Sequence, residues 1–288
     1  MNPLHSAPFL RAYPLFPHGA LNRAAGWLSR ARRPRFAVDA AVRLWIRRAR
    51  IDMSEFAPGP FATVEEFFLR RLQPGARPLA AEPGWVSPVD GHVMASGALA
   101  EEPGGDHAPR LLVKGQLLSL ERLVNGVGAP APIAIEPYRG GAYLVLFLSP
   151  RGYHYVHWPV AATADLCQWL PGRYFPQNEA ALRLLRAVYE RNERLVLRCH
   201  TAQPPGAGGH PFLMILVGAS LVGGIHLRDL PRPAFTRAAP TPCQLRGERG
   251  AELGHFAFGS TVVLLFPRGS APPLPPIGAD LRMGQRLG

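Results

Sequence analysis

Lysine, cysteine and long apolar runs are all scarce in this 288-residue sequence. Uninterrupted apolar runs, such as 143–148, are far shorter than the ~20 residues that a membrane-spanning helix needs, so no spanning helix is predicted. The three cysteines, Cys167, Cys199 and Cys243, do not have the spacing of a metal site, and we expect reduced, mostly buried thiols. Lys114 is the single lysine among 32 basic residues, and all the others are arginines.

Acidic residues are nearly absent from the start of the chain. Residues 1–50 contain ten arginines and one acid, Asp39, which gives this segment a net charge of +9. The other 238 residues hold 22 basic and 19 acidic side chains, a net charge of only +3. A concentrated basic segment attracts anionic lipid or nucleic acid. Because no nucleic-acid-binding motif accompanies the charge, lipid is the favoured partner.

The apolar residues among these arginines predict an amphipathic helix over residues 36–50. One face carries Val38, Ala41, Val42 and Trp45, and the opposite face carries Arg43, Arg47 and Arg50. Such a helix can lie in a membrane surface with its arginines at anionic head groups. The alternative is that the apolar face packs on the protein's own core. We expect residues 1–56 to form a basic amphipathic membrane-attachment segment.

Residues 57–288 are predicted to form a single β-rich catalytic body, which makes the whole chain an α+β protein. Thr63 and Glu66 have the spacing of a capping box, which predicts a short helix through Leu72. The apolar pattern predicts strands at 143–148, 195–199, 212–217, 220–227 and 261–266, and one helix from Asn178 to about Asn192. Clusters of proline and glycine predict surface loops at 101–109, 202–210, 231–242 and 269–276.

Three short segments carry the residue types that activate a serine. Asp90 precedes a glycine in a turn-like motif, His154 and His157 follow an apolar strand, and Gly259-Ser260 precedes another. No acidic residue or cysteine accompanies the histidines at ligand spacing, so no metal site is predicted. A serine needs an imidazole base, which a carboxylate can hold in the right tautomer. The pattern leaves open whether these groups meet in space.

Short motifs follow one another in a distinctive order from about residue 55 onward. They include Phe67-Phe68-Leu69-Arg70, Ser87-Pro88-Val89-Asp90-Gly91, Tyr153-His154, His157-Trp158-Pro159, Asn192-Glu193-Arg194 and Phe258-Gly259-Ser260-Thr261. In this order the chain resembles the bacterial phosphatidylserine decarboxylases. Phe258 stands where that family usually has leucine, and Tyr155 where it usually has arginine. The second departure removes a cation between the two histidines, so a substrate contact made by that arginine is not carried over.

The resemblance implies a proenzyme that cuts itself. Asp90 would orient His157, which takes the proton from Ser260 while the serine oxygen attacks the Gly259 carbonyl. β-Elimination and hydrolysis would then leave a pyruvoyl group in place of Ser260. The products would be a large subunit, 1–259, and a small subunit, 260–288. The only cofactor implied is this covalent pyruvoyl group, and no metal is implied.

The resemblance also implies the reaction and its place. The pyruvoyl carbonyl would form a Schiff base with phosphatidylserine, release carbon dioxide and yield phosphatidylethanolamine. His154 would deliver a proton or position the carboxylate. Lys114 and His255 are weaker candidates for substrate contact. The substrate lies in an anionic bilayer, so peripheral attachment to the cytoplasmic face of the inner (cell) membrane is expected, with a homodimer left open.

Three other functions are compatible with the same residues. A pyruvoyl-dependent decarboxylase of a soluble amino acid would keep Gly259-Ser260 but would have no use for the basic N-terminal segment. An unprocessed lipid-binding protein would remain one polypeptide. A serine hydrolase would be labelled covalently at Ser260 by a fluorophosphonate and would not split into subunits.

Overall fold

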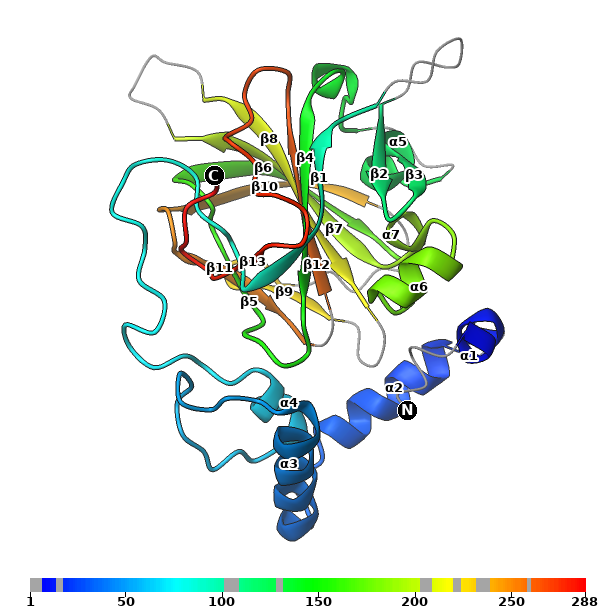
Figure 1. Ribbon diagram of the computed structural model, residues 1–288, viewed down its shortest axis with the longest axis vertical. Helices are drawn as coiled ribbons and strands as arrows, with labels where there is room; N and C mark the ends of the chain where they lie inside the picture. The colour runs from blue at the N-terminus through cyan, green and yellow to red at the C-terminus, as the bar shows by residue number, and fades with distance from the viewer. Residues whose placement is uncertain are drawn as a thin grey trace.

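An eight-stranded antiparallel sheet runs through the centre of the protein (Figure 1). The computed structural model describes residues 7–13, 18–100, 109–127, 132–202, 209–219, 224–231, 239–257 and 260–288. The sheet has the strand order β10-β6-β7-β8-β12-β4-β1-β13. Its strands are β1 (Gly91–Ala98), β4 (Ala142–Leu148), β6 (Ala162–Leu170), β7 (Arg194–Thr201), β8 (Pro211–Gly218), β10 (Ala239–Gly247), β12 (Ser260–Phe266) and β13 (Asp280–Leu281).

Smaller elements cover the two faces of this sheet. A three-stranded sheet in the order β5-β11-β9 consists of β5 (Tyr155–His157), β9 (Ile225–Leu227) and β11 (Glu252–Phe256). The other elements are a hairpin of β2 (Arg110–Val113) and β3 (Gln116–Ser119), the helices α5 (Leu120–Asn125), α6 (Glu179–Leu184) and α7 (Val188–Arg191), and a 3₁₀ turn at Glu136–Tyr138.

The central strand β12 shows how the two faces differ. Its residues alternate between the faces, as strand geometry requires. Val263 and Leu265 join the core beneath the hairpin and α5–α7, whereas Val262 and Leu264 join the core beneath the three-stranded sheet. Ser260 lies two residues before Val262, so the two side chains point to the same face of the sheet. Its side chain therefore belongs to the face that the three-stranded sheet covers.

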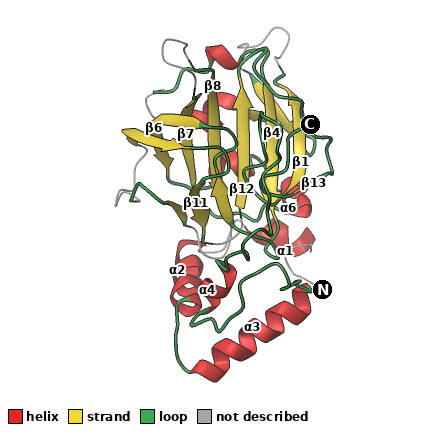
Figure 2. Cartoon of the chain, turned by 90° about the vertical axis from the view of Figure 1, so that its left-hand side faces the viewer, coloured by secondary structure: helices red, strands yellow, loops and turns green. Residues whose placement is uncertain are grey.

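Four helices gather at one end of the sheet layers (Figures 1 and 2). They are α1 (Ala7–Ala12), α2 (His18–Ser29), α3 (Arg35–Ala49) and α4 (Val64–Phe68). None of the helices in the described part of the chain is long and apolar enough to cross a bilayer. The strands and helices described above confirm the predicted α+β architecture with a β-rich body.

The apolar face of α3 packs inside the protein. Val38 and Val42 are buried in a cluster with Phe67 of α4. The Trp45 ring lies 5.7 Å from the Phe67 ring and 5.9 Å from the Phe68 ring. The helix over 36–50 is confirmed, but its apolar face is used for packing, which was the alternative to membrane contact. Burial of that face on the body is favourable in its own right.

Other bulky apolar residues of the N-terminal segment face outward. Trp27 is 76% exposed and Phe36 is 75% exposed. Leu28 and Leu44 are also largely exposed, at 66% and 56%. These side chains, and not the packed face of α3, are the ones available to a membrane.

The capping box at α4 forms largely as predicted. The Glu66 amide donates to the Thr63 hydroxyl at 3.0 Å, and the Glu66 carboxylate accepts from the Ala62 amide at 2.6 Å. The helix ends at Phe68, however, and does not continue to Leu72. The five predicted strands correspond to β4, β7, β8, β9 and β12, although residues 220–223 lie outside the described residues.

Two predictions for the body are wrong. The helix expected over 178–192 is broken into α6 and α7, because the side chain of Gln116 donates to the Leu185 carbonyl and accepts from the Ala187 amide. The loop expected over 231–242 ends in a strand, because β10 begins at Ala239. This strand lies at the edge of the sheet, where prolines that lack an N–H are tolerated.

The other loop predictions have mixed outcomes. Residues 271–276 contain neither helix nor strand and follow a turn, as expected. Most of 101–109 and 202–210 lies outside the described residues. The three cysteines are free and buried, as expected.

Candidate active site

Ser260 is the first residue of β12, the strand between β8 and β4. It lies opposite Gly218 on one side and Leu148 on the other. The residue is wholly buried, and its hydroxyl has no hydrogen-bond partner among the described residues. A buried hydroxyl without a partner is unfavourable and uncommon, which is typical of a group kept for chemistry. Gly259 and Phe258, on the other side of the predicted cut, lie outside the described residues.

His157 is held at both ring nitrogens. Nδ1 lies 2.8 Å from the Gly250 carbonyl oxygen, and Nε2 lies 3.0 Å from the Tyr153 hydroxyl. A carbonyl can only accept, so Nδ1 carries the hydrogen and Nε2 carries the lone pair. Burial raises the pKa of Tyr153 well above its usual value, so the phenol stays protonated and donates to Nε2. Nε2 is therefore the basic nitrogen of His157.

His157 is neutral near physiological pH. Burial lowers its pKa below the ordinary value of 6.5. The hydrogen bond to Gly250 and the negative charges of Glu252 and Asp90 oppose this effect without cancelling it. The neutral form is the one that can accept a proton from a serine.

The lowered pKa of His157 predicts how self-cleavage depends on pH. The rate should be constant through the neutral range and should fall only as the pH falls through the folded pKa, below 6.5. Freshly refolded chain, sampled by intact mass between about pH 5 and 8, would give this profile. Circular dichroism at each pH is the control for folding. A decline centred above 6.5 would contradict the burial argument.

Asp90 follows the Ser-Pro turn and directly precedes β1. Its carboxylate accepts from Arg77 Nε at 2.9 Å and Arg77 Nη2 at 2.6 Å, and from the backbone amide of Met283 at 2.8 Å. Arg77 also pairs with Glu55 at 3.0 Å. Hydrogen bonds to Asp90, and then to Glu55, raise the pKa of Arg77. Asp90 thus links the segment before β1 to the segment that follows β13.

Asp90 and His157 belong to one site without a direct hydrogen bond between them. The backbone amide of His157 donates to the Pro88 carbonyl at 2.8 Å, which places the Asp90 turn beside β5. Among the described residues, the ring of His157 bonds to Gly250 and Tyr153 and not to Asp90. Asp90 acts on His157 through its charge. The orienting contact that was predicted for Asp90 is made here by the Gly250 carbonyl.

His154 is completely buried beside the segment that leads to Ser260. Its backbone carbonyl accepts from the Phe256 amide at 3.0 Å. Its Nδ1 lies 3.1 Å from the Gly152 carbonyl, while Nε2 has no partner among the described residues. Burial, with the nearby charge of Arg70, lowers the pKa of His154 to about 3. His154 therefore offers a second neutral imidazole with a free lone pair.

The two weaker candidates have different positions. His255 lies on β11, opposite Tyr155 of β5, and stacks on His226 at 5.0 Å. Burial, then the charge of His226, lowers the pKa of His255 to about 4. Lys114 lies on the turn between β2 and β3, and its ammonium is 3.4 Å from Glu179. In Figure 1 the β2–β3 hairpin lies at the right of the central sheet, whereas β5 and β11 lie at its left.

Sequence reasoning assigned no role to Arg71 at this site. Its guanidinium lies 4.4 Å from the centre of the Tyr155 ring and pairs with Glu252 at 2.6 Å. A cation is thus present beside β5 although Tyr155 itself is not an arginine. The only hint of Arg71 in the sequence was its position directly after Arg70, the last residue of the Phe67-Phe68-Leu69-Arg70 motif. Gly250, by contrast, acts through its backbone carbonyl and leaves no signal in the sequence.

Within the described ranges, no group of three or more histidine, cysteine or acidic side chains could hold a metal ion. The site instead presents an unpaired serine hydroxyl facing a small sheet that carries neutral imidazoles, with a carboxylate beside them. This combination has the residue types found in enzymes that activate a serine. The sequence profile of the phosphatidylserine decarboxylase family matches residues 64–288, and the chain belongs to that family.

Full-length relatives agree with this assignment. The phosphatidylserine decarboxylase proenzyme of Anaeromyxobacter sp. (strain K) is 36% identical over 299 residues, covering 97% of each chain. The proenzyme of Bordetella pertussis is 33% identical and covers 99% of this chain and 95% of its own. The proenzyme of Pseudomonas putida is 33% identical, with 99% and 98% covered.

Proposed function

We propose that this chain is a proenzyme that cuts itself between Gly259 and Ser260 and then decarboxylates phosphatidylserine to phosphatidylethanolamine. The observation that carries the proposal is the buried, unpaired Ser260 hydroxyl at the head of the central strand. Family membership supplies the reaction class, a carboxy-lyase that depends on a pyruvoyl group.

The residues of this chain can perform the cut without a cofactor. His157, neutral and basic at Nε2, takes the Ser260 proton, after Tyr153 releases that nitrogen. The serine oxygen attacks the Gly259 carbonyl carbon, the C–N bond breaks as His157 gives the proton to the departing Ser260 amine, and the peptide bond becomes an ester. Loss of a proton from the Ser260 α-carbon expels the Gly259 carboxylate and leaves dehydroalanine, which water converts to a ketone and ammonia. The charge of Asp90 stabilises the imidazolium that forms on His157.

Ser260 fits the pyruvoyl group that the family uses. Its side chain is buried on the face that the histidine-bearing sheet covers, and its oxygen is bonded to no described group. When formed, this group supplies a carbonyl that accepts the electrons released as the substrate loses carbon dioxide. His154 holds a buried, unpaired Nε2 that carries no proton at neutral pH; after taking up a proton from solvent, it can pass that proton to the substrate carbon.

The substrate distinguishes this function from its nearest alternative. Purified, processed enzyme should release carbon dioxide from phosphatidylserine in vesicles. It should release none from free serine or phosphoserine. Release from the soluble amino acids but not from the lipid would identify a soluble-substrate decarboxylase instead.

We also propose that the protein works at the surface of a membrane, on the cytoplasmic face of the cell membrane. A substrate with two acyl chains stays in the bilayer, so the enzyme must reach it there. The N-terminal segment combines excess arginine with exposed Trp27 and Phe36. Aromatic side chains favour the interfacial region, and arginines favour anionic head groups.

Removing these two aromatic side chains should weaken membrane binding. We expect Trp27→Ser with Phe36→Ser to lower binding to anionic vesicles at physiological salt by roughly a hundred-fold or more, since each buried aromatic contributes about 1.5–3 kcal/mol. Co-sedimentation measures the effect. Point substitutions are preferable to deleting residues 1–50, because Val38 and Val42 are part of a buried cluster.

The matched control for this experiment is Val127→Ser. Val127 is 80% exposed and lies outside the N-terminal segment, after α5. Vesicle binding should be unchanged in this variant. Equal losses in both variants, or no loss in the double variant, would show that the exposed aromatics are not the contact with lipid.

A further inference from the structure

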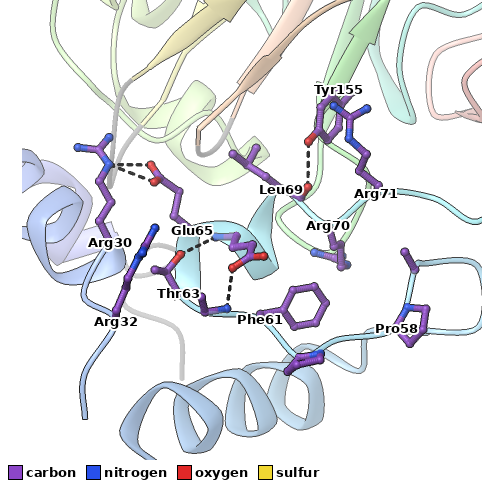
Figure 3. A pocket seen from close by; sticks show the side chains of 14 residues that line it. Arg30, Arg32, Pro58, Phe61, Thr63, Glu65, Leu69, Arg70, Arg71 and Tyr155 are labelled. Carbon is purple, nitrogen blue, oxygen red and sulfur yellow. Dashed lines mark hydrogen bonds and ion pairs between the residues drawn. The ribbon is translucent and has the colours of Figure 1, made fainter. Parts of the chain in front are cut away.

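A pocket of about 710 Å³ lies between the N-terminal helices and the catalytic body (Figure 3). Arg30 and Arg32, after α2, form one side, and residues 57–71 form most of the other. Tyr155 of β5 completes the lining. None of these residues is one of the histidines, Asp90 or Ser260, although Arg71 and Tyr155 lie beside the β5 strand of the site described above.

The lining of this pocket carries more positive than negative charge, since four arginines face two glutamates. Arg30 bonds to Glu65 at 3.0 Å, and Arg71 is paired with Glu252, outside the pocket. Among the described residues, the other two arginines, Arg32 and Arg70, have no carboxylate partner. The pocket therefore holds positive charge that an anion could neutralise.

Arg70 is the unusual member of this set, because it is a buried cation. The residue is only 2% exposed, and its guanidinium lies 4.2 Å from the Phe56 ring and 4.9 Å from the Phe67 ring. It donates to backbone carbonyls, including those of Arg151 and Gly152, and to no carboxylate. Its Nε is buried without a partner among the described residues.

A comparison with Arg77 shows what Arg70 lacks. The Arg77 side chain is also buried, at 6% exposed, but it pairs with Asp90 and Glu55, which raise its pKa. Burial instead lowers the pKa of Arg70 to about 10. A buried charge without a counter-charge is unfavourable, and a bound anion would relieve this.

Residues that line the pocket are neighbours of active-site residues. The positive charge of Arg70 reaches His154, where it helps to lower the pKa. Tyr155 stacks on Tyr153 at 5.1 Å, and the Tyr153 hydroxyl bonds to His157. On the opposite side, Arg30 and Arg32 follow the exposed residues of α2 that face a membrane in the proposed function.

We propose that this pocket binds the phosphodiester of the phospholipid head group. Arg32 contacts the phosphate oxygens, and Arg70 provides the buried counter-charge. The inference rests on the proposed function and adds a binding subsite to it. The phosphodiester is the anion that persists through the reaction, whereas the carboxylate leaves as carbon dioxide. A phosphate held here sits between the membrane surface, where the acyl chains remain, and the histidines that face the serine moiety.

The test uses processed, full-length enzyme and dihexanoyl phosphatidylserine below its micelle concentration, so that no bilayer is present. We expect Arg32→Gln to raise KM about ten-fold, the loss of one charge-assisted hydrogen bond, while kcat changes less than about two-fold. Arg183→Gln removes another exposed arginine, from α6 and away from the pocket, and should leave both constants unchanged. An unchanged KM in Arg32→Gln, or a defect seen only on vesicles, would overturn the assignment.

A binding measurement separates this inference from the proposed reaction. Glycerophosphoethanolamine should raise the melting temperature of the wild type, but not of Arg32→Gln or Arg70→Lys. Arg194→Lys is the control for the loss of a buried guanidinium, because Arg194 also donates to backbone carbonyls but does not line the pocket. Glycerophosphoethanolamine should still raise the melting temperature of Arg194→Lys.

Two other outcomes identify the ligand and the reaction separately. Stabilisation by inorganic phosphate equal to that by glycerophosphoethanolamine would identify a free-phosphate site and overturn the lipid assignment. If the wild type responds but releases no carbon dioxide, the proposed function fails and the pocket stands.

Discussion

Replacing Ser260 with alanine should leave the chain as one uncut polypeptide of 31.4 kDa without decarboxylase activity. The alanine keeps the strand and removes only the hydroxyl oxygen, which attacks Gly259 and later leaves in the elimination that creates the pyruvoyl group. The expected loss of activity is at least about 10⁴-fold, because the variant lacks the reacting carbonyl altogether. Intact mass spectrometry should show two fragments in the wild type, 1–259 and 260–288, with the smaller one blocked to N-terminal sequencing.

Ser270→Ala is a suitable control for this experiment. Ser270 lies after β12 and donates to the Pro267 carbonyl at 2.9 Å, so its loss removes a hydroxyl from the same fragment. This variant should cut itself and turn over normally. The central claim would be defeated by a wild-type protein that stays at full mass, or by a Ser260→Ala variant that still splits.

Replacing His157 with glutamine should slow self-cleavage by about 10²–10⁴-fold, the contribution that a positioned general base makes. Glutamine has a similar length but cannot accept a proton. The Ser260 hydroxyl would then have to react without the basic nitrogen that Gly250 and Tyr153 hold in place. The fraction of uncut chain against time, measured by mass after refolding, gives the rate.

His200→Gln is the matched control for the second experiment. His200 is a half-exposed histidine of β7 whose Nε2 lies 3.7 Å from Asp165. It should leave the rate of cutting unchanged. Normal cutting in His157→Gln would exclude His157 as the base. His154, whose Nε2 is unpaired among the described residues, would then be the next candidate for that role.

Local signals in the sequence predicted many of the elements well. The capping box at Thr63 and the continuous apolar strand at 261–266 both appear, because each depends on neighbouring residues alone. The helix over 178–192 failed because Gln116, far away in the sequence, takes over its backbone hydrogen bonds. Propensity gives no indication of such a tertiary contact.

The apolar face of α3 shows a different limit. A stripe of Val38, Val42 and Trp45 has the same periodicity whether it meets lipid or protein. Only the position of Phe67, which packs against it, decides between the two. Sequence periodicity therefore predicts the helix and its apolar side, but not the partner of that side.

The residues of the candidate site could be named from the sequence, but their contacts could not. Asp90, His154, His157 and Ser260 were all named from short motifs and from the family resemblance. The structure sets Asp90 against Arg77 and turns His157 toward the Gly250 carbonyl. Backbone carbonyls carry no side-chain identity, so no motif could have indicated the second contact.

The position of β12 in the middle of the sheet affects whether the protein can refold after it has been cut. Before the cut, folding is an event within one chain. After the proposed cut, the same central strand would belong to a separate short fragment, held on both sides by β8 and β4. Unfolding would then release two molecules, and refolding would require them to meet again, so recovery would depend on concentration. The mature enzyme would persist because it opens slowly, and not because it can reassemble.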